Sequence, residues 1–523
     1  MKKIFLIFSI IIQSVLSAQS FPNMFNLESG NLKKINDKNP SGNSVEYIDF
    51  LGDTVLIATS VGLSKTSDSG ITWFNHNFGD EGISALSINK DTIWVATWHN
   101  KVINGEDTPV GSGLHYSSDG GTNWTDIPQP IDSLYDTTIV YGENILTSSP
   151  WHTEVTNYTR SIAFTKGKVW IASFAGGLRV SSDIGKTWHK VVLPPDYLDE
   201  IKPTDTLSFD LSPTNAGKGY EANLNHAVFT INVINDSTLY VGTADGINKS
   251  TDGGISWKKF NHKNQTNPIS GNFIVDMKYD FSRNILWAAT WKANGATEYY
   301  GLSSSSDGGE NWKTFLTGEN IHDIAFTYSE NGNEEDIIVA TNNGIFRTND
   351  LGVTWLLAPE IKDDNTNVKI STNKFRAVNC LLDSEGNNNI WIGSDAGGIA
   401  LLKESAGLWE GKWSVFLSSP ALTEVDETYV FPNPFSPDSE VAKFKYSTKG
   451  KPEKVTIRIF DFGMNLVKTI LQNADRKLND SDTSQDYWNG RDENNNIVPN
   501  GVYFYRIDMG DNKPLYGKII VLM

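Results

Sequence analysis

Side chains that could bind an anion recur at one position of a short strand that repeats along the chain. Arginine and histidine side chains form charge-assisted hydrogen bonds with carboxylates. Aligning the seven copies places Glu46, Ser84, Arg160, His226, Val275, His322 and Arg376 at this position. Two arginines, two histidines and one carboxylate would suit an anionic or carboxylate-bearing ligand. We predict a ligand site that includes Arg160, His226, His322, Arg376 and Glu46.

Aromatic residues stand in the long segments between the strands. Trp98, Trp151 and Trp291 are the tryptophans among them, and Tyr141 is a further example. Sugar rings and peptide side chains stack on aromatic rings that have polar groups beside them. The three tryptophans are therefore candidate ligand contacts, and the alternative is that each packs its own loop.

A carboxylate pair is the one arrangement that could support hydrolysis of a glycosidic bond. Asp276 and Asp323 occur at matching places in the segments DMKY and DIAF. The sequence does not tell how far apart they lie, and aspartates in buried strands are often structural. The chain has no Gly-rich phosphate loop, HExxH or GxSxG motif. No residue is assigned as catalytic, and enzymatic activity stays open with a binding role preferred.

Composition excludes several classes of function. The 523 residues carry a net charge of −18 and one cysteine. A strongly acidic chain does not suit nucleic acid, whose phosphates require a basic surface. A single cysteine excludes an intramolecular disulfide and any metal site of several cysteines. We expect no metal and no cofactor.

One eight-residue pattern, Ser/Thr-x-Asp-x-Gly-x-polar-Trp, recurs six times; we call the copies box segments. They are TSDSGITW (66–73), SSDGGTNW (117–124), SSDIGKTW (181–188), STDGGISW (250–257), SSDGGENW (305–312) and TNDLGVTW (348–355). Each follows an apolar run such as IWVATW, and a seventh run, IWIGSDAGGIALL, lacks the box. Each unit therefore predicts four short strands, with the box before the last. Such units bury both of their faces only when they are arranged around an axis, which predicts a seven-bladed β-propeller over residues 21–420.

The box segments resemble the Asp-box or BNR repeat of sialidases, the sortilin luminal domain, xyloglucanases and photosystem II stability factors. In that family the box is a structural turn. The resemblance implies that the box carboxylates hold backbone turns and that the tryptophans pack between blades. The residues concerned are Asp68, Asp119, Asp183, Asp252, Asp307 and Asp350, with Trp73, Trp124, Trp188, Trp257, Trp312 and Trp355.

The enzymes of this family differ from the chain in specific ways. Sialidases carry three arginines and a Phe/Tyr-Arg-Ile-Pro motif; here only Arg160 and Arg376 are suitably placed and the motif is absent. Xyloglucanases pair two propellers around a cleft, whereas this chain predicts one. A glycoside hydrolase acting on extracellular polysaccharide is therefore the alternative to binding, and a purely structural surface protein is a third possibility.

The longest insertions are expected on one face. They cover residues 98–113, 125–159, 193–225, 261–272, 291–302 and 357–375, in the connections opposite the box turns. Binding residues are commonly found on long loops. We therefore expect an insertion-rich face that recognises a glycan or a protein.

The chain begins like an exported protein. Two lysines precede the apolar run IFLIFSIIIQSVL and small residues follow it. This pattern predicts a signal peptide over residues 1–20, cleaved after Ala18 or Ser20. No other segment approaches the length of a membrane span. The mature protein should pass through the periplasm to the cell surface or the medium.

Residues 428–523 end the chain with alternating strands such as VTIRIF and VYFYRI, which predict an Ig-like β-sandwich. The segments PNPF, WNGRDENNNIVPNGVYFYRI and KIIVL resemble the Ig-like domain of the flagellar hook-capping protein and the sorting domain of type IX secretion substrates. The second resemblance implies that the secretion machinery is a partner. Its candidate motif residues are Pro432, Asn433, Pro434, Gly517 and Lys518. The first implies only a structural module.

Overall fold

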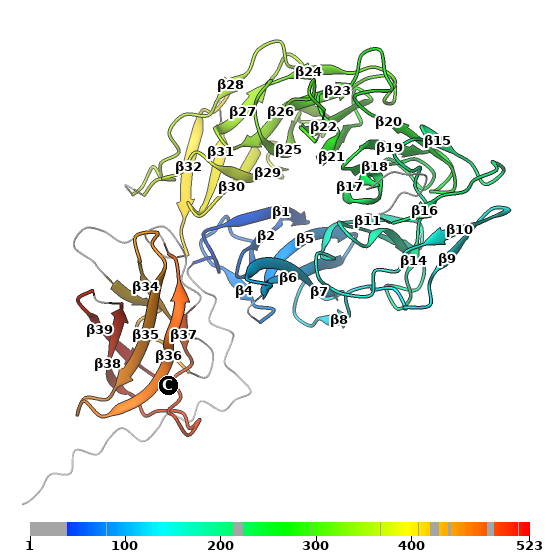
Figure 1. The fold of residues 1–523 in the computed structure, drawn as a ribbon. Helices are drawn as coiled ribbons and strands as arrows, with labels where there is room; N and C mark the ends of the chain where they lie inside the picture. The colour runs from blue at the N-terminus through cyan, green and yellow to red at the C-terminus, as the bar shows by residue number, and fades with distance from the viewer. Residues whose placement is uncertain are drawn as a thin grey trace, which may run out of the picture.

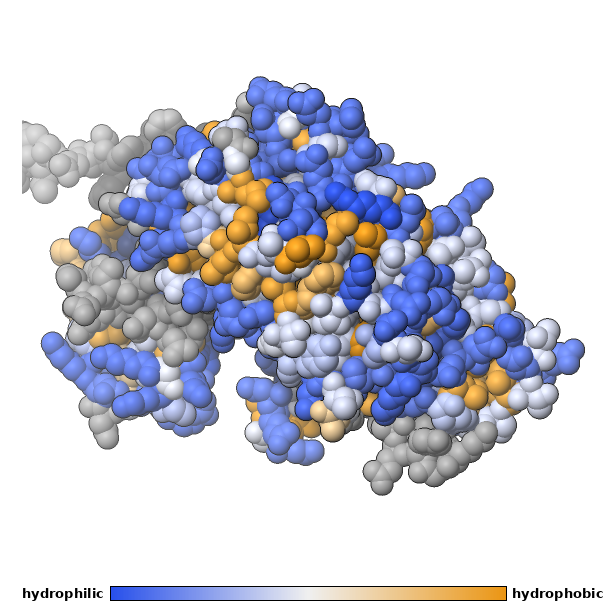
Figure 2. Space-filling model, turned by 90° about the horizontal axis from the view of Figure 1, so that it is seen from above, coloured by the Kyte–Doolittle hydropathy of each residue, from blue (hydrophilic) through white to orange (hydrophobic). Residues whose placement is uncertain are grey.

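The computed structural model describes residues 39–79, 81–212, 223–293, 295–366, 368–405, 407–418, 428–437, 441–478, 486–510 and 512–523. The expected signal peptide lies outside these residues. Within them the structure is all-β, and the only helical element is the three-residue 3-10 turn η1 (Leu224–His226), which is far too short to cross a bilayer. The side of the molecule seen from above is mostly hydrophilic, with an apolar band running through it (Figure 2).

Seven sheets follow one another along residues 45–416, each starting with its innermost strand. The first three contain β1 (Val45–Leu51), β2 (Thr54–Thr59), β3 (Gly62–Thr66) and β4 (Phe74–His76); β5 (Gly82–Asn89), β6 (Thr92–Ile103), β7 (Glu106–Ser117) and β8 (Thr125–Ile127); and β11 (Thr159–Thr165), β12 (Lys168–Ser173), β13 (Gly177–Ser181) and β14 (His189–Lys190). The fourth contains β17 (Val228–Val233), β18 (Leu239–Thr243), β19 (Gly246–Ser250) and β20 (Trp257–Phe260), with β15 (Glu200–Ile201) as a fifth strand beside β20. The last three contain β21 (Phe273–Asp280), β22 (Ile285–Trp291), β23 (Gly301–Ser305) and β24 (Lys313–Phe315); β25 (Ile321–Tyr328), β26 (Glu334–Thr341), β27 (Gly344–Thr348) and β28 (Leu356–Leu357); and β29 (Phe375–Leu382), β30 (Asn388–Ser394), β31 (Ile399–Glu404) and β32 (Gly411–Phe416).

The sheets form a closed ring (Figure 1). Each innermost strand contacts the innermost strand of the next sheet, and β29 returns to contact β1. At this closure the Asn379 side-chain amide donates a hydrogen bond of 2.9 Å to the Ile48 carbonyl. Trp73 packs there against Trp391 and Phe416 from the last sheet, with ring centroids 6.3 and 5.5 Å away. The two ends of the ring are therefore joined by side chains more than 300 residues apart in sequence.

The second strand of each sheet forms from an apolar run, and its residues are almost all buried. An apolar strand of this kind is stable only when both of its faces are covered. Here neighbouring sheets cover both faces, so that the clusters of core residues lie between adjacent sheets. The hydrophobic effect thus drives the sheets together around the axis.

The six box segments lie between the third and fourth strands of their sheets. In the last of them, the Asp350 carboxylate accepts hydrogen bonds from the Thr354 amide at 2.9 Å and the Thr354 hydroxyl at 2.7 Å. The Thr348 hydroxyl donates to the same carboxylate and accepts from the Gly352 amide. Gly352 has φ +90°, where a side chain would be strained. The box carboxylates therefore fix the turns.

Acid should weaken the boxes. Hydrogen bonds from the Thr187 hydroxyl and amide lower the pKa of Asp183 from 3.8 to about 2. A depressed pKa adds stability above the unfolded value, and this stability is lost as pH falls through the folded value. We expect Asp183→Asn to lower Tm at pH 7, and the difference from wild type to shrink between about pH 4 and about pH 2. Thermal melts across this range test this, with the exposed Asp53→Asn as control; a difference that does not change with pH would contradict it.

At least two of the insertions reach the box turns, which the sequence prediction had placed on the opposite face. β9 (Thr138–Tyr141) and β10 (Asn144–Ser148) pair with β16 (Asp210–Leu211) in a separate sheet at the periphery of the ring (Figure 1). From there the Tyr141 hydroxyl donates to the Ile255 carbonyl, inside a box segment. Gln265, in another insertion, donates to the Glu310 carbonyl of the next box. The fourth strands are short, and these insertions cover the edges that the short strands leave open.

Residues 428–523 form two further sheets. One contains β33 (Thr428–Phe431), β34 (Ala442–Tyr446) and β37 (Tyr487–Trp488); the other contains β36 (Leu466–Arg476), β35 (Glu453–Phe460), β38 (Gly501–Met509) and β39 (Leu515–Val521). Both contribute to one apolar core, in which Phe444, Ile457, Trp488 and Tyr505 are almost fully buried.

The PNPF segment is bound to the end of the chain. The Asn433 side chain donates to the Lys518 carbonyl and accepts from the Ile520 amide, both at 2.8 Å. The Phe435 amide donates to the Ile520 carbonyl at 3.0 Å, and the Leu522 amide donates to the Phe435 carbonyl at 3.1 Å. The two sequence motifs therefore form one unit along the outer edge of β39.

Candidate functional site at the centre of the ring

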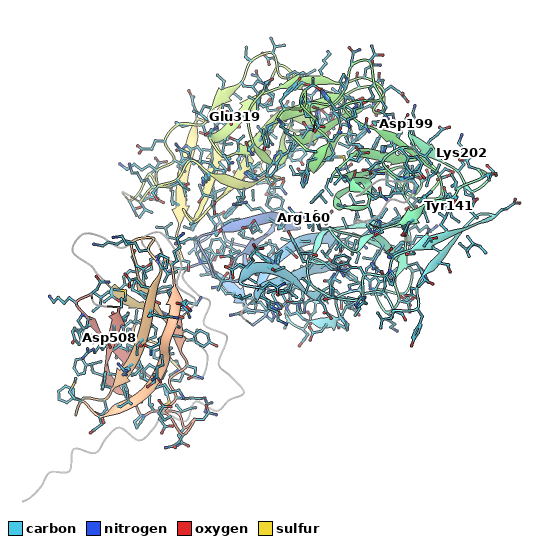
Figure 3. All side chains as sticks on the ribbon, viewed as in Figure 1. Tyr141, Arg160, Asp199, Lys202, Glu319 and Asp508 are labelled. Atoms are coloured by element: carbon cyan, nitrogen blue, oxygen red, sulfur yellow. The ribbon has the colours of Figure 1, made fainter. Side chains whose placement is uncertain are left out.

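A cavity of about 310 Å³ lies at the centre of the ring and is lined mainly by the innermost strands. Arg160 is placed at this centre (Figure 3). Of the residues predicted from the sequence alignment, Glu46, Arg160, Val275, His322 and Arg376 line the cavity, together with Trp291. Ser84 is buried and, like His226, is not among the lining residues.

A β-bulge explains why these residues share a position. Each of the seven innermost strands shifts register at its start, so one residue has no partner on the second strand. The unpaired residues are Glu46, Ser84, Arg160, Phe229, Val275, His322 and Arg376. Bulges commonly re-aim a side chain at a functional site. Here they form a ring of unpaired residues, five of which, besides Val275 and Phe229, are polar.

The register of the fourth sheet shows that the prediction for His226 is wrong. It belongs to η1, and Phe229 takes the bulge position in its place. Burial lowers the pKa of His226 to about 3, helped by the charges of Lys190 and Arg179, so its ring is neutral. A sequence feature could have identified Phe229 as the bulge residue. In each innermost strand a large apolar residue follows the bulge residue by two positions, as Ile231 follows Phe229.

Aromatic rings form an arc beside the cavity, from the second sheet to the sixth. Trp98 stacks on Tyr158 at 5.7 Å, and the guanidinium of Arg160 lies 5.5 Å from the Tyr158 ring and 5.3 Å from Phe229. The arc continues through Phe273 to Trp291 and His322, with centroid distances of 4.2, 6.4 and 5.4 Å. Phe229 and Trp291 line the cavity, whereas Trp98, Tyr158 and Phe273 are not among its lining residues. Trp98 and Trp291 were predicted as ligand contacts, and Phe229 was not. Trp151 donates its ring N–H to the Val155 carbonyl and does not line the cavity.

Charged groups complete the ring on the first and seventh sheets. An Arg376 nitrogen lies 3.2 Å from Asp395. Burial raises the pKa of Glu46, and the nearby Arg376 and Arg160 only partly offset this. His322 hydrogen-bonds to the Asn342 side chain at 2.9 Å, and burial lowers its pKa. Within the described residues no group of three His, Cys, Asp or Glu side chains could hold a metal ion.

Asp276 and Asp323 lie deeper in the cavity wall. They accept hydrogen bonds from the amides of Ile324 and Val378 on the next sheets. Burial raises the pKa of Asp323 to about 7 although Lys278 is near. The two amide contacts link the fifth sheet to the sixth and the sixth to the seventh, which gives these aspartates a role in joining sheets.

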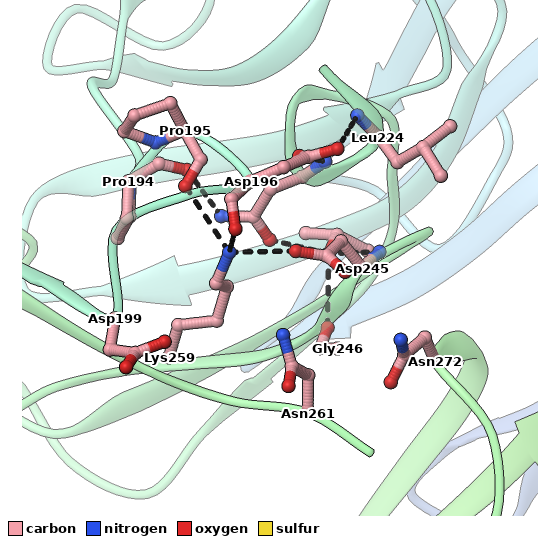
Figure 4. Close-up of polar contacts among 12 residues, drawn as sticks. Pro194, Pro195, Asp196, Asp199, Leu224, Asp245, Gly246, Lys259, Asn261 and Asn272 are labelled. Carbon is pink, nitrogen blue, oxygen red and sulfur yellow. Dashed lines mark hydrogen bonds and ion pairs between the residues drawn. The ribbon is translucent and has the colours of Figure 1, made fainter. Parts of the chain in front are cut away.

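Buried ion pairs anchor the insertions to the ring. The fully buried Lys259 ammonium lies 2.7 Å from Asp245 and donates to the carbonyls of Pro195 and Asp196 (Figure 4). The Asp196 carboxylate accepts from the amides of Leu224 and Asn225 in η1, which precedes β17. Asp132 plays a similar part for the preceding insertion, between Arg179 at 2.7 Å and Lys190 at 2.6 Å. These contacts position the strands that carry Arg160 and Phe229.

Comparisons with known proteins fit this architecture. No family model matches the chain. The xyloglucanase Xgh74A of Acetivibrio thermocellus is 26% identical over 192 residues, which are 36% of this chain and 17% of that protein. The structure of the GH74 xyloglucanase from Xanthomonas campestris has a TM-score of 0.51 and 13% identity, covering 91% of this chain and 66% of that one. A structure of YCF48 bound to D1 peptide has a TM-score of 0.42 and 16% identity, covering 71% and 96%. The chain thus matches less than a fifth of its curated relative, and its ring of sheets is a β-propeller similar to that of glycoside hydrolases.

Proposed function

We propose that this chain is an extracellular, carbohydrate-recognising propeller that binds a glycan across the central cavity. The observation that carries the proposal is that the rings of Phe229 and Trp291, both members of the aromatic arc, line the cavity beside the polar bulge residues. Aromatic faces pack against the apolar C–H faces of sugars, while polar side chains hydrogen-bond to hydroxyl groups. In this proposal the seven sheets are the blades of an Asp-box propeller and the box segments are its structural turns.

Loss of one aromatic ring should weaken binding. Trp291 lines the cavity and donates its ring N–H to the Ile321 carbonyl at 2.8 Å. We expect Trp291→Ala to weaken glycan binding about tenfold, equivalent to about 1.4 kcal/mol. A glycan array followed by titration calorimetry measures this. Trp151→Ala is the matched control, because that ring lies off the cavity; equal losses in the two variants would contradict the proposed site.

Hydrolysis is the second candidate, favoured by the similarity to xyloglucanases. Glu46, which lines the cavity, would be the acid of this reaction, and Asp395, which pairs with the cavity-lining Arg376 at 3.2 Å, would be the base. Glycosidases require one protonated and one ionised carboxyl group. Incubation with xyloglucan should release reducing ends in wild type and not in Glu46→Gln. Binding without product would leave recognition as the function.

We further propose that residues 428–523 form an Ig-like domain that directs export. The contacts between Asn433 and β39 support this, because they hold both motif segments in one surface. A reporter that carries a signal peptide and residues 428–523 should reach the medium or the cell surface in a host with type IX secretion. Asn433→Ala should reduce export, whereas retention of the unaltered fusion in the periplasm would contradict the proposal.

A further inference from the structure

The arginines of the propeller differ in what neutralises them. Four of the five between residues 39 and 418 lie within 4.0 Å of a carboxylate: Arg179, Arg283, Arg347 and Arg376 pair with Asp132, Asp280, Asp336 and Asp395. Arg160 has no carboxylate at this distance among the described residues, although it is half-buried. Burying a charge without a partner is costly.

The guanidinium of Arg160 is held in place with most of its donors unused. One nitrogen hydrogen-bonds to the Tyr158 hydroxyl at 2.7 Å, and the rings of Tyr158 and Phe229 pack against the group. A guanidinium has five N–H donors in a planar fork that matches a carboxylate with two parallel hydrogen bonds. The group lines the cavity, so a ligand there can reach it.

We propose that Arg160 binds the carboxylate of an acidic sugar, a uronate unit of the glycan that the cavity recognises. This inference rests on the proposed function and adds the class of sugar to it. Arg376, on the seventh sheet, is already paired with Asp395, and only one of its nitrogens is so engaged. The uronate ring would lie beside the aromatic arc with its carboxylate toward Arg160.

Glu46 also lines the cavity, and its carboxylate would repel a bound anion. It carries the only carboxylate among the bulge residues and interacts electrostatically with Arg160 and Arg376. A ligand carboxylate therefore competes with Glu46 for the two guanidinium groups. Replacing Glu46 with glutamine should strengthen binding of an acidic sugar several-fold relative to binding of a neutral sugar.

The test compares three probes by titration calorimetry: a galacturonate oligosaccharide, its methyl ester and a neutral xyloglucan oligosaccharide. Wild type should bind the free acid at least tenfold more tightly than the ester. Arg160→Gln should remove this preference, so that the free acid and its ester bind with equal affinity, and Arg160→Lys should restore it only in part, because lysine lacks the planar fork. Arg283 does not line the cavity, so Arg283→Gln should bind the three probes with the same affinities as wild type.

The possible results distinguish failure of the carboxylate assignment from failure of glycan binding itself. If wild type binds the acid and its ester equally, the inference is wrong, and this comparison needs no variant to fold. If the neutral probe binds and the acid does not, the carboxylate assignment fails while glycan recognition stands. If no glycan binds wild type, the proposed function itself fails. A sulfated oligosaccharide that binds more tightly than the uronate would assign Arg160 to sulfate and overturn the proposal.

Discussion

Replacing Lys259 with methionine is expected to lower the free energy of unfolding by about 3–5 kcal/mol, the usual cost of removing one partner of a buried ion pair. The Lys259 ammonium is fully buried and lies 2.7 Å from Asp245, whose pKa burial raises to about 6. The substitution would leave this carboxyl group without its cation and free the carbonyls of Pro195 and Asp196. Urea titration followed by tryptophan fluorescence measures the change.

The adjacent lysine provides a matched control. Lys258 pairs with Glu310, but both side chains are about half exposed. Exposed ion pairs contribute about 0.2–1 kcal/mol, so Lys258→Met should change stability by no more than this. Adding Asp245→Asn to Lys259→Met should recover part of the loss by removing the unpaired carboxyl group. Similar effects of the two lysine variants would show that the buried pair does not anchor the insertion.

Trp73→Ala is expected to destabilise the propeller by about 3–5 kcal/mol, because it opens a cavity where the ring closes. The Trp73 side chain is fully buried, and its ring N–H donates to the Gly70 carbonyl at 3.1 Å. It packs between Trp391 and Phe416, so its loss weakens the contact between the first and last sheets. Thermal and urea unfolding of the variant measure this effect.

Trp355 is the control for this prediction. It occupies the same place in the sixth box segment, but it is only half-buried, and its ring centroid lies 6.4 Å from that of Phe315. Trp355→Ala should therefore cost less than half of what Trp73→Ala costs. Equal losses of stability in the two variants would mean that the box tryptophans stabilise their own turns and not the closure of the ring.

The repeated parts of this structure could be predicted from the sequence, because each repeat carries the same local pattern of residues. The box segments show where each third strand ends, and the apolar runs show which strands are buried. Alignment of the repeats also placed Glu46, Arg160, His322 and Arg376 around one cavity. It failed at His226 because η1 precedes β17 and shifts the apparent start of that strand.

The contacts between distant segments could not be predicted in this way. Nothing in the spacing of Asp132 and Arg179, or of Asp245 and Lys259, shows that these residues pair inside the protein. The insertions were placed by strand counting alone, which ignores the edges of short outer strands such as β14. Tyr141 and Gln265 therefore reach the box turns and not the cavity. The aromatic arc was missed in part because Phe229 and Phe273 read as ordinary strand residues.

A crystal structure with a bound oligosaccharide would show whether the central cavity binds a glycan. We expect sugar rings in the cavity, in contact with Trp291 and Phe229 and with polar atoms of the ligand at Arg160. Oligosaccharide bound only at the periphery of the ring or at the box turns, with the cavity empty, would contradict it.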